Sequence, residues 1–373
     1  MRVLFVVGAL AVGGGERHTV DLALALVARG HVCRIVSVKP AEKGGLNVPA
    51  AQGLDVTYCD AAGYLDRDAL RSLAVMEADF CPDLIVGVNQ YALMYVHLAR
   101  LFKGAVAAPI AAVFHTTELR TRKDHWLNVI YKRFFARSAL LVFVCDYQSR
   151  YWQQRGLAAR RNLVIHNGID AGRYSPAKDA VRAAVRKQHG FAEGDFVIGI
   201  TAALRPEKNH AFLIQALRRL REQGVPAKLL MLGNGPLRAD LEARVTELGL
   251  GAHAVFAGAH ADVRPFIAAF DVMTLASTHI ETFSLAVLEA MSMGIPAVIS
   301  DIGGAREMVF PGVNGFVYPA NDMEGYLEAL GILLDGGRRH TMGVEARRVV
   351  LENFTGDVMV EHYRKAFAEV TGT

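Results

Sequence analysis

Short, mostly apolar runs recur along the chain, and each is followed by a stretch with helical periodicity. Strands that are buried on both faces of a parallel sheet have this composition, because helices cover both sides of such a sheet. The runs therefore predict an α/β chain with two doubly wound parallel sheets. The expected strands are 2–8, 32–38, 55–58, 84–88, 110–114, 140–144 and 163–166 in the first sheet, and 197–202, 227–232, 254–257, 272–275, 297–300 and 315–317 in the second.

The two series are separated by a segment that has no apolar run. Residues 168–195 begin with turn residues and continue with a charged stretch, so we expect a linker and domain entry there. The 373 residues are thereby divided into a first domain at 1–167 and a second at 196–354. A further helix is expected at 355–373 and can pack back on the first domain. Two Rossmann-like domains of this kind bind ligands outside the carboxyl ends of their strands, in a cleft between them.

The composition excludes several classes of protein. A formal net charge of +4 is too small to indicate nucleic-acid binding. The apolar start passes directly into Gly13-Gly14-Gly15, which fits a first strand and its turn better than a secretion signal. No apolar stretch approaches the length of a membrane-spanning helix, so we expect a cytoplasmic protein. The four cysteines lack zinc-ligand spacing and are expected to be reduced thiols: Cys33, Cys59, Cys81 and Cys145.

The segment 277–307 places two acids among apolar residues. It predicts a loop, a helix from about Phe283 and a short strand at 297–300. The helix is apolar on almost every side yet carries Glu289, and a buried carboxylate is costly unless it is hydrogen-bonded. Ligand hydroxyls would serve as its partners. Glu281 precedes the helix with seven residues between the two acids; a solvated Glu281 and a core salt bridge at Glu289 are the structural alternative.

Two features of the second domain favour an anion. The first turn of the same helix, at Ser284 and Leu285, offers free backbone N–H groups to a group such as a diphosphate. Arg205 and Lys208 follow the first strand of that domain, at a strand-to-helix turn. They could neutralise a leaving diphosphate, although basic residues at helix starts are often only solvated.

The first domain offers a glycine-rich turn and a histidine. Gly14 and Gly15 follow the first strand, but the spacing from Gly8 does not match the dinucleotide fingerprint. We expect a flexible turn whose N–H groups face a phosphate or an acceptor, and a tight turn without a ligand is the alternative. His115 ends the expected strand 110–114 and is followed by threonines. It is either a ligand-binding residue or a satisfied structural histidine.

These motifs keep one order along the chain and together resemble the retaining glycosyltransferases of family four, which have the GT-B fold. The two acids resemble the Glu-x(seven)-Glu signature of that family. Further matches span the whole chain and are densest in residues 199–320; they include 167–170 at the hinge, 233–236, 256–260 and 303–307.

The resemblance implies roles for single residues. His115 would approach the donor sugar, Glu281 would orient the sugar hydroxyls and Glu289 would bind the ribose. The family commonly has an arginine where this chain has Ala203, and Arg205 is expected to replace it by reaching back over the turn. Lys208 matches the family lysine that stabilises the leaving diphosphate. Nucleotide binding would involve Gly14, Gly15, Gly233, Asn234, His260, Phe283, Ser284 and Leu285.

The resemblance also implies the reaction. A hexosyl group would pass from a nucleotide-diphosphate sugar to a hydroxyl acceptor with retention, in the biosynthesis of a cell-surface glycan such as lipopolysaccharide, capsule or exopolysaccharide. No Asp/His metal cluster is evident, so we expect neither a metal nor a cofactor besides the donor. Three alternatives stay open: transfer to a small soluble acceptor, epimerisation of a nucleotide sugar, and binding without turnover. Both acids and Lys208 are present, which argues against the last.

The segment 119–137 carries an excess of basic residues and is expected to be helical. Trp126, Ile130 and Phe134 recur every four residues and form one stripe. In the structural interpretation the helix buries this stripe on its own sheet. In the functional interpretation a basic, aromatic face rests on anionic lipid and brings the enzyme to a lipid-linked acceptor. The cations are Arg120, Arg122, Lys123, Lys132, Arg133 and Arg137.

Overall fold

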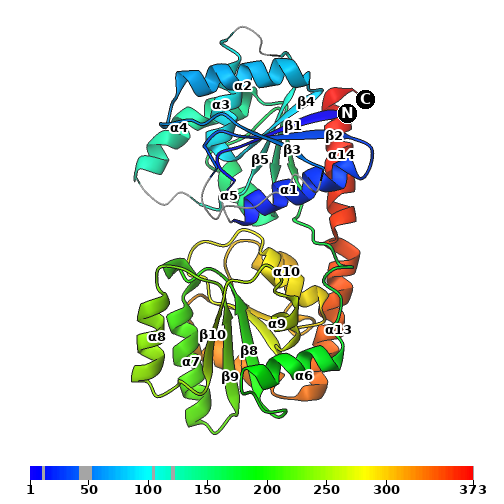
Figure 1. Ribbon diagram of the computed structural model, residues 1–373. Helices are drawn as coiled ribbons and strands as arrows, with labels where there is room; N and C mark the ends of the chain where they lie inside the picture. The colour runs from blue at the N-terminus through cyan, green and yellow to red at the C-terminus, as the bar shows by residue number, and fades with distance from the viewer. Residues whose placement is uncertain (11–12, 42–52, 103–105, 119–121, 373) are drawn as a thin grey trace. The chain divides into compact units, whose positions relative to one another are not determined.

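The structure is a computed structural model that describes residues 1–10, 13–41, 53–102, 106–118 and 122–372 (Figure 1). The chain divides into two compact units. Unit 1 contains Met1–Asn167 and Gly356–Thr373, and unit 2 contains Gly168–Thr355. Each unit is an α/β domain built on one parallel sheet, as the sequence predicted.

The sheet of unit 1 has seven parallel strands in the order β3-β2-β1-β4-β5-β6-β7. The strands are β1 (Arg2–Val7), β2 (Val32–Ser37), β3 (Asp55–Tyr58), β4 (Leu84–Val88), β5 (Ile110–Phe114), β6 (Leu140–Phe143) and β7 (Arg161–Val164). Every residue of β4 and β5 is buried, as expected for strands covered on both faces. The direction of the strand order reverses between β1 and β4, where a doubly wound sheet forms its binding crevice.

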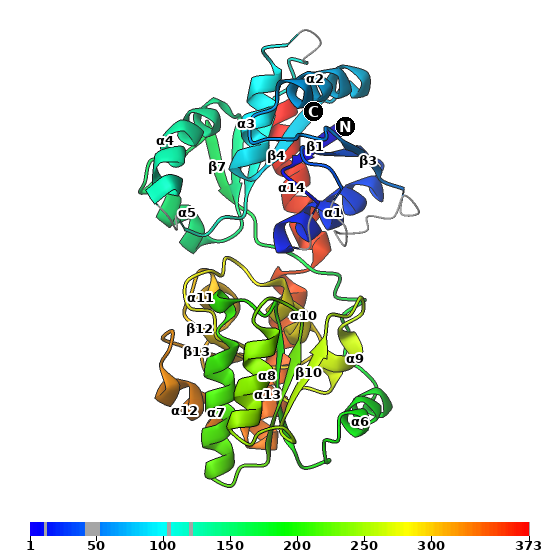
Figure 2. The ribbon, with the colours of Figure 1, turned by 60° about the vertical axis from the view of Figure 1, so that its left-hand side comes forward.

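Helices from both ends of the chain cover one face of this sheet. α1 (Gly14–Val27) and α14 (Gly356–Thr371) lie side by side in Figure 1 and again in Figure 2. They enclose one hydrophobic core, to which Leu22 and Phe367 contribute. A second core on the opposite face is covered by α2 (Arg67–Phe80), α3 (Asn89–Ala99), α4 (Arg122–Arg137) and α5 (Asp146–Gln153).

Unit 2 has a sheet of six parallel strands in the order β10-β9-β8-β11-β12-β13. The strands are β8 (Phe196–Thr201), β9 (Ala227–Leu232), β10 (Ala254–Gly258), β11 (Val272–Leu275), β12 (Ala297–Ser300) and β13 (Gly315–Tyr318). The strand order reverses between β8 and β11. The helices are α6 (Asp179–Gln188), α7 (His210–Glu222), α8 (Arg238–Glu247), α9 (Arg264–Ala268), α10 (Leu285–Ser292), α11 (Ala305–Met308), α12 (Met323–Leu333) and α13 (Gly336–Asn353).

The segment that we expected to be a linker, 168–195, is part of unit 2 and contains helix α6. The sequence did not predict this helix, because charged side chains rather than a wide apolar stripe attach it to the rest of the domain. Arg182 and Arg186 donate hydrogen bonds to Asp271 over 2.7 and 2.5 Å, and the backbone N–H of Val197 donates to the same carboxylate over 2.8 Å. Asp271 is only 6% exposed, so this cluster ties α6 to the start of two central strands.

Within the described part of the chain, none of the helices has the length and apolar content needed to cross a bilayer.

We expect Asp271→Asn to destabilise the protein by about 3–5 kcal/mol, because it leaves the buried guanidinium of Arg186 without its carboxylate. Urea unfolding measures the loss. The matched control is Glu222→Gln, which removes the partner of Arg218 from an exposed ion pair and should cost less than about 1 kcal/mol. Equal effects of the two variants would contradict a structural role for the buried cluster.

Candidate functional site

Two predicted site residues meet at the point where the strand order of unit 2 reverses. Lys208 lies in the loop after β8, and Glu281 lies in the loop after β11, the neighbouring strand. The Lys208 Nζ atom donates a hydrogen bond to Glu281 Oε2 over 2.6 Å. The two side chains are 22% and 19% exposed, so a ligand in solution can reach both. The pair therefore presents a cation and a carboxylate at the carboxyl edge of the sheet.

The loop that carries Glu281 is held by several contacts. Ser277 is fully buried, and its hydroxyl donates to Glu281 Oε2 over 3.2 Å. The backbone N–H of Thr278 donates to the carbonyl of Glu207, which joins the loop to the one that carries Lys208. Gly303 has φ +60°, and a Cβ atom there would lie 1.8 Å from the carbonyl oxygen of Glu281. Only glycine permits this approach to the backbone of Glu281. The side chain and the backbone of Glu281, and the loop that carries them, thus each have a contact that holds them.

Helix α10 follows this loop and begins two residues later than predicted. Phe283 precedes the helix and is buried against Phe354, with ring centroids 5.3 Å apart. Ser284 is the N-cap and its hydroxyl accepts a hydrogen bond from the N–H of Val287, whereas Leu285 is the first helical residue. Glu289 is in the second turn and only 2% exposed, as expected for a carboxylate within an apolar helix.

The other predicted residues of unit 2 lie at the same edge of the sheet. The N–H of Leu204 donates to the carbonyl of Asn234, and the N–H of Gly233 donates to the carbonyl of Gly258. The loops after β8, β9 and β10 are thus hydrogen-bonded to one another. Arg205 is exposed and forms no ion pair within the described ranges, so its side chain is free to reach a ligand.

His260 lies just beyond β10. Its Nε2–H group donates to the carbonyl of Ala257 over 2.8 Å, and its ring packs on Phe266 at a centroid distance of 4.2 Å. The residue is exposed.

In unit 1 the structure brings two predicted features together. His115 follows β5, and its backbone N–H donates to Asn89 Oδ1 over 2.8 Å. Asn89 holds this position with φ +62°, an uncommon conformation for a residue other than glycine. A Cβ atom at Gly15 would lie 3.1 Å from the ring of His115, so a larger residue there would crowd the histidine. Gly14 and Gly15 are the first helical residues of α1 rather than part of a loose turn.

His18 and Tyr363 were not predicted, yet His18 packs on His115 and Tyr363 packs on His18. The ring of His18 lies edge-on to that of His115 at 4.8 Å, and Tyr363 of α14 lies 5.6 Å from His18. Both are buried, and burial lowers the pKa of His115 to about 4 and that of His18 well below its usual value. His115 is therefore a neutral imidazole at physiological pH. A polar residue on the apolar face of α1 was the sequence signal for His18, whereas nothing local linked Tyr363 to this cluster.

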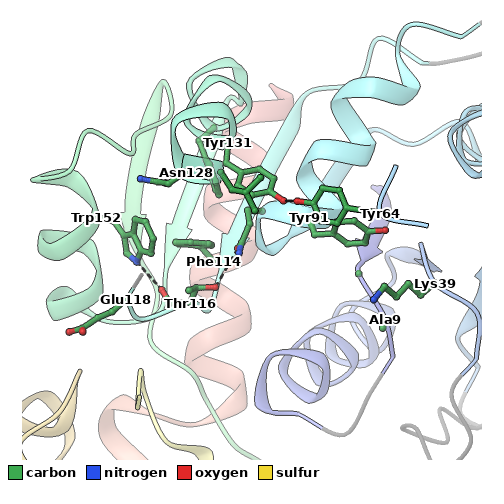
Figure 3. A pocket seen from close by; sticks show the side chains of 14 residues that line it. Ala9, Lys39, Tyr64, Tyr91, Phe114, Thr116, Glu118, Asn128, Tyr131 and Trp152 are labelled. Atoms are coloured by element: carbon green, nitrogen blue, oxygen red, sulfur yellow. Dashed lines mark hydrogen bonds between the residues drawn. The ribbon is translucent and has the colours of Figure 1, made fainter. Parts of the chain in front are cut away.

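Unit 1 also contains a cavity of about 570 Å³ at the carboxyl edge of its sheet (Figure 3). It was not predicted, because its walls come from segments that are far apart in sequence. Aromatic side chains dominate the walls, with Lys39 and Glu118 at opposite ends of the view. The lining residues include Lys39, Tyr64, Gln90, Tyr91, Thr116, Glu118, Asn128, Tyr131 and Trp152.

Helix α4 buries a different face from the predicted stripe. Its inner face is formed by Asn128, Tyr131 and Phe135, whereas Trp126 is 79% and Ile130 is 52% exposed. The prediction of a buried stripe was therefore wrong for Trp126 and Ile130, because the buried positions are shifted by one residue around the helix. Arg120 lies outside the described residues, as do the side chains of Arg122 and Lys123.

Comparison with known proteins identifies the family. The profile described as Glycosyltransferase Family 4 matches residues 12–173, and that described as Glycosyl transferases group 1 matches residues 181–349. A GDP-mannose-dependent alpha-(1-6)-phosphatidylinositol monomannoside mannosyltransferase of Mycolicibacterium smegmatis is 33% identical over 267 residues, 69% of each chain. The chain belongs to the glycosyltransferases that these two profiles describe, family 4 and group 1.

Two further similarities extend the comparison. A UDP-Gal:alpha-D-GlcNAc-diphosphoundecaprenol alpha-1,3-galactosyltransferase of Escherichia coli is 24% identical, over 71% of this chain and 72% of that protein. The crystal structure of Anabaena HepE with UDP-glucose superposes with a TM-score of 0.84 at 23% identity, covering 99% of this chain and 100% of HepE. The glycosyltransferase therefore has the GT-B fold, with two Rossmann-like domains.

We expect His115 of this glycosyltransferase to stay neutral from about pH 8 down to about pH 5.5, because burial lowers its pKa to about 4. NMR of the imidazole groups measures this, and His115→Gln assigns the resonance. The unfolded chain binds the proton at the ordinary histidine pKa, so this site should also reduce the free energy of unfolding as the pH falls below about 6.5. Titration of His115 at the ordinary pKa would contradict its burial.

Proposed function

We propose that this glycosyltransferase moves a hexosyl group from a nucleoside-diphosphate sugar to a hydroxyl acceptor with retention of anomeric configuration. The observation that carries the proposal is the Lys208–Glu281 pair where the strand order of unit 2 reverses. The cation can neutralise a leaving diphosphate, and the carboxylate can accept hydrogen bonds from sugar hydroxyls. The names of the relatives support such a donor, since they mention GDP-mannose and UDP-Gal, and HepE was crystallised with UDP-glucose.

The pair has a simple function in the free enzyme. Lys208 and Glu281 are hydrogen-bonded to each other until a donor binds. The donor then offers a phosphate to the lysine and hydroxyls to the carboxylate. The N–H groups in the first turn of α10 add a second source of positive potential for the diphosphate. Arg205 is exposed and can turn toward the same phosphate. Their shared task is to stabilise negative charge that develops as the sugar leaves.

Glu289 and His115 would bind the uncharged parts of the donor. Glu289 can accept hydrogen bonds from the ribose hydroxyls, and its apolar surroundings strengthen such bonds. The neutral ring of His115 can hydrogen-bond a sugar hydroxyl without repelling the cationic character that the sugar gains in the transition state.

Retention follows from attack on the face that the diphosphate leaves. The bond between the anomeric carbon and the phosphate oxygen breaks, and the acceptor oxygen bonds to the same face. The acceptor proton passes to the departing diphosphate. The chain's own residues supply orientation and charge stabilisation, and the proposal assigns neither a covalent nucleophile nor a divalent metal to them.

We propose a lipid-linked acceptor, used in the biosynthesis of a cell-surface glycan. The names of both relatives quoted above mention lipid acceptors, a phosphatidylinositol mannoside and a diphosphoundecaprenol. In this chain α4 exposes Trp126, Val129 and Ile130, with Arg133 also exposed on the same helix. An exposed apolar face with basic residues is the composition of a helix that lies in the surface of an anionic membrane. It would hold the enzyme near such an acceptor.

The test of the reaction is incubation with a panel of UDP, GDP and ADP sugars and a lipid-phosphate-linked sugar acceptor, with NMR of the fresh product. The product should keep the anomeric configuration of the donor, and chelation of divalent cations should leave turnover unchanged. Lys208→Met should lower turnover about 100-fold or more by removing charge stabilisation from the transition state.

The matched control is Lys187→Met, which removes an exposed cation from α6 of the same unit. It should have wild-type turnover. An inverted product would falsify the retaining assignment. Conversion of the donor into another nucleotide sugar without acceptor would instead identify an epimerase.

Membrane contact is tested by sedimentation with liposomes at low and high salt. We expect binding that requires anionic lipid, falls with salt and is weakened in Trp126→Ser and in the double variant Lys132→Glu, Arg133→Glu. Val344→Ser, at a similarly exposed valine of α13, is the control and should bind like the wild type. If the wild type stays in the supernatant with every lipid, α4 does not contact membranes and a soluble acceptor is favoured.

A further inference from the structure

A second cavity lies in unit 2, at the amino edge of its sheet. Its volume is about 380 Å³, within the usual range for small-ligand sites of about 300–1,000 Å³. Its walls come from the loops that precede β8 and β9 and from the position just before β11. The two edges of a parallel sheet are opposite, and the six residues of β8 span about 20 Å. The cavity is therefore separate from the Lys208–Glu281 pair at the carboxyl edge.

Three arginines share the buried carboxylate of Asp271 beside this cavity. Arg182 and Arg186 hydrogen-bond to it, and Arg339 Nε lies 3.3 Å from its Oδ1 atom. The side chain of Arg186 is 7% exposed, whereas those of Arg182 and Arg339 are 32% and 26% exposed. One carboxylate balances only one of three positive charges. The cluster therefore carries excess positive charge, and its two more exposed members line the cavity.

The other acids that line the cavity do not pair with these arginines. Asp195 Oδ2 lies 3.8 Å from Lys228 Nζ and accepts a hydrogen bond from the N–H of Ala192 over 2.7 Å. Glu193 is exposed, and its carboxylate forms no ion pair with any described residue. Within the described part of the chain, Asp271 is thus the only carboxylate that forms an ion pair with Arg182 or Arg339.

The two exposed arginines are held in place and still have unused donors. Arg182 Nη1 donates to the carbonyls of Ala268 and Phe270 over 3.0 and 2.6 Å. Arg339 Nη1 donates to the carbonyl of Leu333 over 2.7 Å. Among the described residues, Arg182 Nε and Arg339 Nη2 have no hydrogen-bond acceptor. Each guanidinium is therefore fixed by the protein and keeps N–H groups for a ligand.

The positive charges of the cluster repel one another. Burial lowers the pKa of the Arg186 guanidinium; Asp271 raises this pKa, and the charges of Arg182 and Arg339 lower it further. Arg182 and Arg339 both contact Oδ1 of Asp271, so their guanidinium groups are neighbours. An anion between them would offset the repulsion. Phosphate suits this position, because guanidinium groups donate paired, charge-assisted hydrogen bonds to its oxygens.

The rest of the cavity offers surfaces for an organic group. The guanidinium of Arg339 lies over the ring of Phe196, with its central carbon 5.6 Å from the ring centroid. Leu334 is 38% exposed and lines the cavity, as does the exposed amide of Gln223. Apolar surface with a few polar groups is typical of a site for a small organic molecule.

We propose that this cavity is a phosphate-binding site, with the phosphate held by Arg182 and Arg339. The phosphate can come from two sources. One is the free ion, and the other is a sugar phosphate whose organic part contacts Leu334 and Gln223. The site is distinct from the donor and acceptor sites of the proposed function and does not depend on that function.

Calorimetry on the full chain measures binding of inorganic phosphate, of glucose, fructose and mannose 6-phosphates, and of glucose without a phosphate. We expect inorganic phosphate or at least one sugar phosphate to bind more tightly than glucose. Arg339→Met should weaken that affinity at least about tenfold, because it removes charge-assisted hydrogen bonds. Arg348→Met is the matched control. It removes an exposed arginine from the same helix and should bind like the wild type.

Two further variants separate binding from stability. Arg339→Lys keeps the positive charge beside Asp271 but loses the paired donors, so it should fold like the wild type and bind phosphate more weakly. Gln223→Trp fills the cavity from an exposed position and leaves the arginine cluster intact. It should weaken binding of a sugar phosphate at least about tenfold without changing the free energy of unfolding.

The probes also identify the source of the phosphate. Tighter binding of a sugar phosphate than of inorganic phosphate indicates a phosphorylated sugar, and equal binding indicates the free ion. Two results would overturn the proposal. One is that no phosphate-bearing probe binds more tightly than glucose. The other is that binding is unchanged in Arg339→Met but lost in Lys208→Met, which places the probe in the donor site instead.

Discussion

Parallel strand pairing is the constraint on which the rest of this structure depends. In a parallel sheet all carboxyl ends lie at one edge, and each return to the other edge needs a crossover helix. Loops that are distant in sequence are therefore gathered at that edge, most openly where the strand order reverses. Lys208 and Glu281 are 73 positions apart and still form a direct ion pair, because β8 and β11 are neighbours. The sheet holds these loops, and the loops supply the charges.

Uncommon backbone conformations lie beside two of the candidate site residues, Glu281 and His115. Gly303 allows the chain to approach the carbonyl of Glu281 more closely than any side chain would permit. Asn89 adopts a left-handed conformation, and its side-chain Oδ1 accepts a hydrogen bond from the backbone N–H of His115. Conformations of this kind cost free energy and persist only where surrounding contacts hold them. In unit 2 the buried ion cluster at Asp271 lies at the start of β11, and Glu281 follows the other end of the same strand.

The candidate site residues of unit 1 include buried, neutral histidines, whereas those of unit 2 include an ion pair that solvent can reach. Its histidines at positions 18 and 115 are kept neutral by desolvation, and Tyr363 from the last helix packs against the first of them. The C-terminal helix is therefore part of the surroundings of a candidate site formed near the N-terminus. The cavity on the same unit is aromatic, with one lysine that lacks a described carboxylate partner. A neutral, aromatic site suits sugar rings, whereas the cationic edge of unit 2 suits a diphosphate.

The sequence by itself determined the two parallel sheets and the position of nearly every strand. It also placed Lys208, Glu281 and His115 beyond the carboxyl ends of strands, and Glu289 within an apolar helix. These depend on local patterns of burial and on motif spacing, which are visible in one dimension.

Tertiary structure alone decided the rest. Helix α6 is attached by arginines to a carboxylate far along the chain, so no apolar stripe revealed it. The sequence left open whether the stripe of α4 is buried or exposed, because the buried face depends on what the helix packs against. The cavity of unit 1 is lined by segments between Gly8 and Trp152, and the approach of Tyr363 to His18 joins the last helix to the first. Such long-range contacts leave no periodic signal in the sequence, since they arise only when packed helices and strands bring distant side chains together.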